Sequence, residues 1–174
     1  MRKLREYAMT LITAIIIALL INKFIIANAV VPTGSMEPTI MHTSSFIVDK
    51  ISYKFMEPRR GDIIVFFAPD LENILYLKRI VALPGETIEG KDGEIYINND
   101  KLVESYVADK ISNDFGPYTV PDNEYFVLGD NRNYSLDARY WEDKYVNKSE
   151  IIGKALLEYI PEIELFRKVT YNID

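Results

Sequence analysis

The chain of 174 residues has a formal net charge of −6, no cysteine and a single histidine, His42. This composition excludes disulfides, a thiolate nucleophile, cysteine-ligated metals and a histidine-rich metal centre. We expect neither a metal nor a cofactor. Without the first 29 residues the chain keeps 16 basic and 25 acidic side chains, a net charge of −9 that argues against a nucleic-acid partner.

A basic and then strongly apolar segment opens the chain. Three basic residues within the first five positions precede an apolar run of 21 residues from Tyr7 to Ala27. About 20 apolar residues suffice to span a bilayer, and flanking positive charges favour the cytoplasmic side. The pattern predicts a single-pass protein of the cell membrane with three parts: a cytoplasmic tail over residues 1–6, a transmembrane anchor over residues 7–27 and an extracytoplasmic domain over residues 28–174.

The same segment also fits a cleavable signal peptide. Ala27-Asn28-Ala29 has the small residues of a cleavage site after a basic start and an apolar run. Cleavage there would leave a soluble, secreted protein, and from this segment alone both interpretations stay open. A buried helix of a soluble protein is disfavoured because the run is apolar on all sides.

A short loop follows the apolar run, with the sequence Pro32-Thr33-Gly34-Ser35-Met36-Glu37-Pro38. The two prolines fix φ and lack an N–H, so neither a helix nor a strand should continue through this loop. Gly34 permits a close backbone approach or a positive φ just before Ser35. These features predict a stiff, exposed serine at the membrane edge, although an ordinary turn fits the heptapeptide as well. His42 is seven residues from Ser35, which is not a spacing that favours a Ser-His-Asp triad, and we interpret it as a surface residue.

From Ser44 onward, short apolar stretches alternate with turn signals, which is typical of β-strands. We predict strands over residues 45–50, 62–68, 74–83, 124–128 and 151–160, with a helix as the alternative for the last. We also predict a hairpin over residues 87–97 around Gly90-Lys91-Asp92, a turn at 98–101 and a long loop within 104–119. Many short strands without a long amphipathic helix predict a mainly β fold of folded antiparallel sheets or a barrel.

Lys78 lies within one of these apolar strands. By side-chain alternation it shares a face with Tyr76 and Ile80, whereas Arg79 shares the other face with Leu77. Burial, and the neighbouring charge of Arg79, would lower the pKa of the Lys78 amine. At an ordinary pKa of about 10.4, fewer than about one lysine in a thousand is neutral at pH 7. A pKa lower by about 2 to 3 would make Lys78 a usable general base, but a lysine that points to solvent fits the same residues.

The polar segment from Gly129 to Arg139 is dense in residues that form turns and hydrogen bonds. Within it, Asp137 and Arg139 are two positions apart and would share a face of an extended chain. A surface loop with a weak ion pair is one interpretation. A loop that hydrogen-bonds a buried amine and holds it in place is the other.

Together and in this order, the serine loop, the lysine strand and the polar segment resemble the bacterial type I signal peptidases of the small, single-anchor kind. The resemblance covers nearly the whole chain, and the stretches that carry it are Gly34–Thr39, Arg60–Phe66, Tyr76–Glu86, Gly129–Arg132 and Ser135–Arg139. The chain departs from the usual family pattern at four positions: Ala82, Glu86, Tyr134 and Ala138. The resemblance implies a membrane-bound serine endopeptidase with a Ser–Lys dyad on a β-rich fold similar to that of self-cleaving phage and SOS repressors.

The resemblance also implies roles for individual residues. By position, Ser35 matches the nucleophile and Lys78 the general base. Ser135 matches a hydroxyl that orients the lysine amine, and Thr33 matches a hydroxyl that completes the oxyanion hole with the Ser35 N–H. The supporting charged residues are Asp137, Arg139, Asp130 and Arg79. Candidate walls of a shallow substrate pocket are Val31, Met36, Tyr76 and Leu77, and core packing explains these apolar residues equally well.

The expected activity is removal of signal peptides from secretory preproteins that carry small residues before the cleavage site, with the lipid bilayer as the second partner. An anchored, catalytically inert module that binds exported peptides is the alternative. A third interpretation is a secreted globular protein whose N-terminus is removed. The presence of both Ser35 and Lys78 disfavours an inert module.

Overall fold

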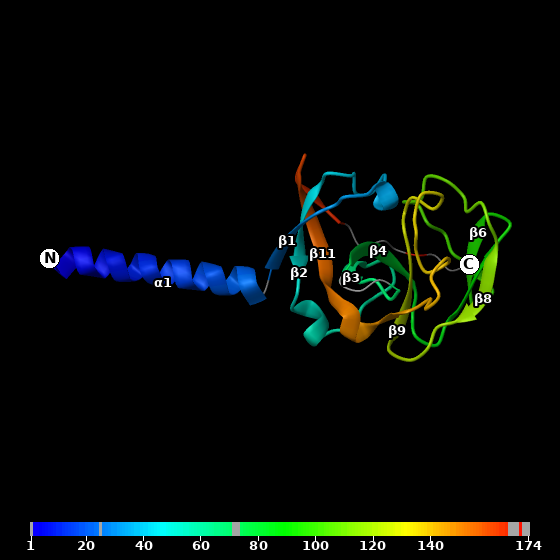
Figure 1. Cartoon of the computed structure of the whole chain (residues 1–174), viewed down its shortest axis with the longest axis horizontal. Coiled ribbons are helices and arrows are strands. Elements are labelled where there is room, and N and C mark those ends of the chain that lie inside the picture. Colours follow the sequence, from blue (N-terminus) through cyan, green and yellow to red (C-terminus); the bar gives the residue numbers. More distant parts are fainter. Residues whose placement is uncertain (1, 25, 71–73, 167–170, 172–174) are drawn as a thin grey trace.

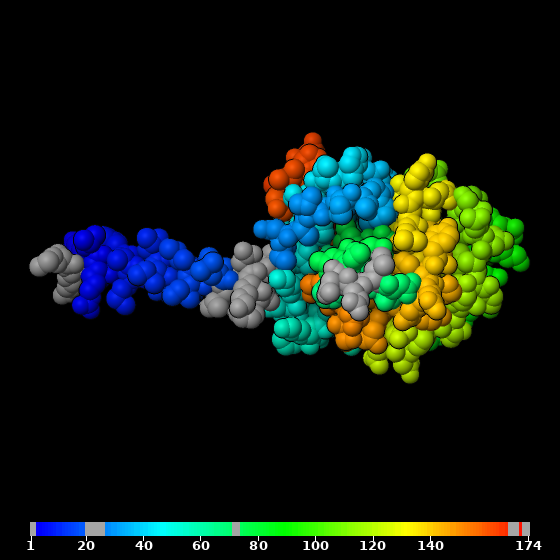
Figure 2. All heavy atoms as spheres, in the orientation of Figure 1, coloured from blue at the N-terminus to red at the C-terminus, as the bar shows by residue number. Residues whose placement is uncertain are grey.

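The N-terminal helix stands apart from a body of β-sheets in the computed structural model. The structure describes residues 2–24, 26–70, 74–166 and 171, with the backbone alone for residues 2, 20–24 and 26. Helix α1 (Arg2–Phe24) extends away from the sheets, as Figures 1 and 2 show. Large apolar side chains along it are exposed, among them Leu11, Ile15 and Leu19. No helix among the described residues is both long enough and apolar enough to cross a membrane.

Strand β1 (Ile26–Val30) begins where the sequence predicted the end of the anchor. It forms the edge of the larger sheet and pairs antiparallel with β2, with Ala27 opposite Val48 and Ala29 opposite Phe46. The segment Ala27–Ala29 therefore lies in a paired strand of the body rather than in a helix.

The described residues form two antiparallel sheets, which confirms the predicted mainly β fold. The larger sheet contains, in spatial order, β1, β2 (Ser45–Asp49), β11 (Ile151–Ile160), β3 (Ile63–Phe67), β4 (Leu75–Ala82), β9 (Glu124–Leu128) and β10 (Val146–Asn147), and β12 (Glu164–Leu165) pairs with β11. The smaller sheet contains, in spatial order, β7 (Asp100–Lys101), β6 (Glu94–Ile97), β5 (Thr87–Lys91) and β8 (Phe115–Thr119). Three single 3₁₀ turns lie in the described connections: η1 (Gly34–Met36), η2 (Ser52–Lys54) and η3 (Lys148–Glu150).

The prediction of a continuous loop within residues 104–119 is wrong at its end, because Phe115–Thr119 forms β8 and pairs with β5. Gly116 and Pro117 interrupt the strand pattern in the sequence, and proline is tolerated on an edge strand such as this one. Tertiary packing holds the strand in place: a Cβ added at Gly90 would lie 2.3 Å from the ring of Phe115. The predicted turn at 98–101 likewise contains β7, and 151–160 is a strand rather than a helix.

Strands β3 and β4 are the centre of the body because both of their faces are covered. Ile64 and Phe66 of β3 pack into one hydrophobic cluster, whereas Ile63 and Val65 pack into another on the opposite face. In the β3–β4 register, Lys78 is opposite Ile64. Lys78 therefore arises from a strand that is buried on both faces, which sets the environment of its amine.

Candidate active site

Ser35 lies in the 3₁₀ turn η1, which is docked against the loop after β9. The Asn131 backbone N–H donates to the Ser35 carbonyl at 3.1 Å, and Asn131 Nδ2 donates to the Gly34 carbonyl at 3.1 Å. A Cβ at Gly34 would come within 3.1 Å of Glu37 Cδ, a contact that a small shift of the Glu37 side chain would relieve. The sequence predicted an exposed serine, but docking of the turn leaves Ser35 only 7% exposed.

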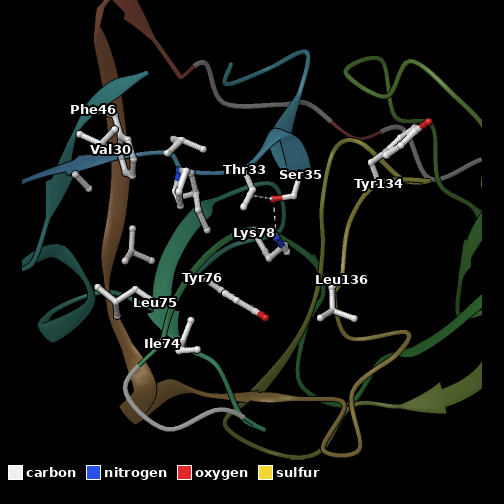
Figure 3. A pocket seen from close by; sticks show the side chains of 15 residues that line it. Val30, Thr33, Ser35, Phe46, Ile74, Leu75, Tyr76, Lys78, Tyr134 and Leu136 are labelled. Atoms are coloured by element: carbon white, nitrogen blue, oxygen red, sulfur yellow. Dashed lines mark hydrogen bonds between the residues drawn. The ribbon is translucent and has the colours of Figure 1, made fainter. Parts of the chain in front are cut away.

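The side chains of Ser35, Lys78 and Thr33 converge, as Figure 3 shows. Lys78 Nζ lies 2.7 Å from Ser35 Oγ, and the Thr33 hydroxyl donates to Ser35 Oγ at 3.3 Å. Lys78 is only 4% exposed, and its amine also lies 5.2 Å from the centroid of the Tyr76 ring. A serine hydroxyl and a buried amine are thus within hydrogen-bonding distance, which is what proton transfer between them requires.

Burial lowers the pKa of Lys78 to about 8, while the carboxylates of Asp137 and Asp130 raise it and the guanidinium of Arg139 lowers it. With a pKa of about 8, roughly one amine in ten is neutral at pH 7. The sequence suggested Arg79 as the cation that disfavours the ammonium. Arg79 is instead paired with Asp130, so its charge is compensated.

The first supporting ion pair joins Arg79 to Asp130. Arg79 Nε and Nη2 donate to the two carboxylate oxygens of Asp130 at 2.8 and 2.6 Å, and Arg79 Nη1 donates to the Gly61 carbonyl at 2.9 Å. Both side chains are buried. A bidentate pair of this kind fixes the geometry of both groups, and here it does so directly beside Lys78 in the chain.

The second supporting ion pair joins Arg139 to Asp137. Arg139 Nε and Nη2 donate to the Asp137 carboxylate at 2.7 and 2.9 Å, and Arg139 Nη2 also donates to the Arg132 carbonyl at 2.6 Å. Asp137 Oδ2 accepts from the Gly129 N–H at 3.0 Å. The pair therefore ties the polar segment to the end of β9, and both side chains are buried.

Ser135 lies in the same segment and is 6% exposed, but among the described residues its buried Oγ has no hydrogen-bond partner. The hydrogen bond to Lys78 that the family resemblance implied is thus not formed in this structure. A Cβ at Gly129 would come within 2.2 Å of Ser135 Oγ and 2.5 Å of the Ser35 carbonyl oxygen. Gly129 therefore makes room for both serines. The sequence placed Gly129 and Asn131 within a stretch that carries the family resemblance but assigned neither a role, because their contacts exist only in three dimensions.

A cavity of about 450 Å³ opens beside Ser35 and Lys78 (Figure 3). Three of the predicted walls line it: Val31, Tyr76 and Leu77. Met36, the fourth, lies outside its lining and packs fully buried in the hydrophobic cluster around Val31 and Phe46, so the prediction for Met36 is wrong. Lining residues that the sequence did not single out include Val30, Phe46, Val65, Leu75, Tyr134 and Leu136.

Comparison with known proteins gives the family. Residues 4–160 match the family model described as signal peptidase, peptidase S26. The chain is 39% identical to signal peptidase I of Leptolyngbya laminosa, over 91% of this chain and 80% of the relative. It is 38% identical to a probable signal peptidase I-2 of Synechocystis sp., over 90% of this chain and 73% of the relative.

A third relative, signal peptidase I S of Bacillus subtilis, is 37% identical over 94% of this chain and 93% of its own length. A crystal structure of a signal peptidase I from Enterococcus faecalis aligns with a TM-score of 0.49 and 36% identity, over 57% of this chain and 97% of that one. The family match covers both residues of the contact between Ser35 and Lys78. The chain therefore belongs to the signal peptidase family, peptidase S26.

Proposed function

We propose that this chain is a membrane-anchored serine endopeptidase that removes signal peptides from exported preproteins, with Ser35 as the nucleophile and Lys78 as the general base. The observation that carries the proposal is the distance of 2.7 Å between Lys78 Nζ and Ser35 Oγ in a buried site. Family membership supports hydrolysis, and the inert peptide-binding module is not favoured.

The first step forms the acyl-enzyme. Neutral Lys78 takes the proton from Ser35 Oγ as the oxygen attacks the scissile carbonyl, and the resulting ammonium protonates the leaving amine. The Ser35 N–H and the Thr33 hydroxyl would stabilise the oxyanion, since the Thr33 hydroxyl already reaches the Ser35 side chain at 3.3 Å. Loss of one such donor costs about 3–4 kcal/mol of transition-state stabilisation in a comparable site.

The second step releases the acyl group. Lys78, again neutral, deprotonates a water that hydrolyses the ester on Ser35. The ion pair of Asp137 and Arg139 supports this cycle because it fixes the segment that carries Ser135. We assign Ser135 the role of orienting the lysine amine, and its buried, unpartnered hydroxyl among the described residues is available for that bond.

The apolar cavity beside the dyad is the candidate site for the substrate residues before the cut. Val31, Tyr76 and Leu77 line it, and its lining is mainly apolar. We propose that this cavity receives small side chains at the positions one and three before the cut. An apolar lining suits small apolar side chains because no polar group is left unpaired there, and family membership supports the small size.

We further propose that α1, together with its basic N-terminal residues, anchors the chain in the membrane with the β body on the outer side. The exposed apolar side chains along α1 support this assignment, because a solvated helix of that composition would leave a large apolar surface in water. The basic residues Lys3 and Arg5 precede the apolar stretch, which favours a cytoplasmic N-terminus.

Two variants test the dyad. Ser35→Ala and Lys78→Ala, assayed separately on a secretory precursor in detergent, should each lose at least about a thousandfold of the wild-type turnover. Ser149→Ala and Lys54→Ala, which change the same residue types on the exposed surface, should cleave at the wild-type rate. Turnover near the wild-type value in either dyad variant would refute the assigned mechanism.

Fractionation of cells that express the full chain tests the anchor. The intact chain should sediment with the membranes, and its body should be digested by protease added to the outer face. A soluble fraction that carries a chain beginning at Val30, with no intact chain in the membranes, would show that the N-terminal segment is a removed signal peptide instead.

A further inference from the structure

Tyr171 lies beyond residues 4–160, which the family model matches, yet its side chain packs against Gly61 and against the hydrophobic cluster that contains Ile64 and Phe66. A Cβ added at Gly61 would come within 2.8 Å of the Tyr171 ring, so the ring lies directly on that glycine. The Tyr171 hydroxyl donates to the Tyr106 hydroxyl oxygen at 3.1 Å. The two rings meet edge to face, with centroids 6.2 Å apart.

Both contacts of Tyr171 lead to Arg79. The Arg79 guanidinium carbon lies 3.9 Å from the centroid of the Tyr106 ring, a cation–π contact. On the other side, Arg79 Nη1 donates to the carbonyl of Gly61, the residue that Tyr171 covers. The remaining donors of this guanidinium hold Asp130. Tyr171 and Tyr106 thus form an aromatic cover over the Arg79–Asp130 ion pair.

Tyr106 extends this cover to the polar segment. Its hydroxyl donates to Glu104, whose carboxylate accepts from Arg132 at 2.6 and 2.7 Å. Arg132 Nε in turn donates to the Gly129 carbonyl at 3.0 Å. These hydrogen bonds therefore also connect the aromatic cover to Gly129, the glycine that makes room for Ser135 and Ser35.

Each member of the covered ion pair is adjacent in the chain to a residue that is part of the dyad or contacts it. Arg79 follows Lys78 in β4, and Asp130 precedes Asn131, which hydrogen-bonds the carbonyl groups of the turn that carries Ser35. A charged pair that is kept from water retains a stronger attraction and a narrower geometry than one that water reaches. A cover on the Arg79–Asp130 pair thereby constrains both members of the dyad.

We propose that Tyr171 is a positioning residue of the enzyme: Tyr171 and Tyr106 cover the Arg79–Asp130 pair, keep water from it and so fix the carboxylate that acts on the Lys78 amine. The inference rests on the proposed function, since it assigns Tyr171 to the service of the Ser35–Lys78 dyad. Burial raises the pKa of Tyr171 to about 12, so its hydroxyl stays protonated and can donate at neutral pH.

Removal of the aromatic cover should shift the pKa of Lys78 in a defined direction. The Asp130 carboxylate raises the pKa of Lys78, and a carboxylate less well paired with Arg79 would raise it further. This effect favours the ammonium. Loss of Tyr171 should therefore move the acidic limb of the pH–rate profile to higher pH and lower kcat at neutral pH, while KM for a precursor changes little.

The test compares Tyr171→Ala with wild type as the full-length chain in detergent. We expect kcat at pH 7 to fall about tenfold, KM to stay within about twofold and the acidic limb to rise by roughly half a pH unit or more. Tyr96→Ala is the matched control, because Tyr96 is a half-buried tyrosine of the smaller sheet, and it should leave the profile in place. An unchanged acidic limb in Tyr171→Ala would overturn the proposal, even if the thermal stability falls.

Two further measurements keep the outcome decisive. If Tyr171→Ala does not fold, Tyr171→Phe keeps the ring on Gly61 and removes only the hydrogen bond to Tyr106, and a fall in kcat of about twofold with a smaller rise of the limb is expected. A Tyr171→Phe profile identical to wild type would then refute the proposal. Lys78→Ala in the same assay separates the hypothesis of the dyad from the hypothesis about Tyr171. A Lys78→Ala enzyme that still cleaves would refute the dyad. If Lys78→Ala is inactive, the dyad is supported, and the profile of the Tyr171 variants then tests Tyr171 alone.

Discussion

Lys78 Nζ lies 2.7 Å from Ser35 Oγ although the two residues are 43 positions apart in the sequence. β4 brings the amine, and the turn η1, docked against Asn131, brings the hydroxyl. Both side chains are buried, so the amine loses much of its preference for the charged form at the point where it meets the hydroxyl. Burial in the core therefore favours the neutral amine, the form that the proposed proton transfer from Ser35 requires.

The turnover of the enzyme should rise with pH along an acidic limb whose midpoint lies near pH 8, where half of the Lys78 amines are neutral. Burial lowers the pKa of Lys78, and only the neutral amine can accept the Ser35 proton. Measurement of kcat on a precursor between about pH 6 and about pH 10 locates the limb. A limb near the ordinary lysine value of 10.5, or a rate independent of pH, would contradict this assignment.

Lys78→Met should abolish cleavage and yet stabilise the fold at pH 7. The pKa of Lys78 is about 8 in the folded state against 10.5 for the unfolded chain, so between these values the unfolded state binds more protons and the stability of wild type rises with pH. Below pH 8 the burial of the charge costs its full amount. A methionine removes this cost, and we expect a gain of about 1–3 kcal/mol at pH 7.

Thermal unfolding of Lys78→Met and wild type at pH 7 and again at about pH 9.5 measures this gain, which should narrow as the pH rises. Lys54→Met is the control, because Lys54 is exposed. A Lys78→Met variant that is less stable than wild type at pH 7, with no dependence of the difference on pH, would show that burial of the Lys78 ammonium does not destabilise the folded state.

Asp137→Asn should move the acidic limb to lower pH. The Asp137 carboxylate raises the pKa of Lys78, and its loss leaves the Arg139 guanidinium, which lowers that pKa, without compensation. The plateau rate should fall at the same time, because the bidentate pair that holds the segment is broken. Comparison of kcat profiles with Asp143→Asn, an exposed carboxylate nearby, isolates the effect. A limb displaced to higher pH would be inconsistent with the geometry of the pair.

Gly129→Ala should reduce kcat by about a hundredfold or more, because the new methyl group would overlap Ser135 Oγ and the Ser35 carbonyl oxygen at 2.2 and 2.5 Å. Gly90→Ala is matched to it: its methyl group would overlap the Phe115 ring at 2.3 Å in the smaller sheet. Both variants should lose stability, but only Gly129→Ala should lose turnover per folded molecule. Active-site titration combined with thermal unfolding separates the two, and equal turnover losses would count against a local role of Gly129.

Leu77→Ala should widen the preference for the residue before the cut. Leu77 lines the cavity beside the dyad, and its truncation adds space for a larger side chain. For precursors with leucine in place of alanine before the cut, we expect the ratio of kcat/KM values to shift toward leucine by about tenfold. Leu83→Ala, outside the cavity lining, is the control. An unchanged ratio of kcat/KM values would show that the residue before the cut does not bind in the cavity that Leu77 lines.

Local patterns in the sequence were sufficient for most strands and for the stretches that hold the dyad. They failed where long-range packing overrides them. Phe115–Thr119 is a strand because it pairs with β5 and fills the space at Gly90, and Ile26–Val30 is a strand because it pairs with β2. Met36 could not be separated from the pocket walls, since an apolar side chain next to Ser35 suits a cavity and a core equally.

The sequence by itself determined the residue types and their order: a serine between Gly34 and Met36, a lysine in an apolar strand and a polar segment with Asp137 and Arg139. Alternation along β4 also placed Lys78 on the face of Tyr76 and Ile80. Only the tertiary structure decided that the amine meets the hydroxyl, that Arg79 is compensated by Asp130, and that Tyr171 covers this pair. The physical reason is that burial and charge pairing depend on groups far apart in the chain, and no local pattern records which of them come together.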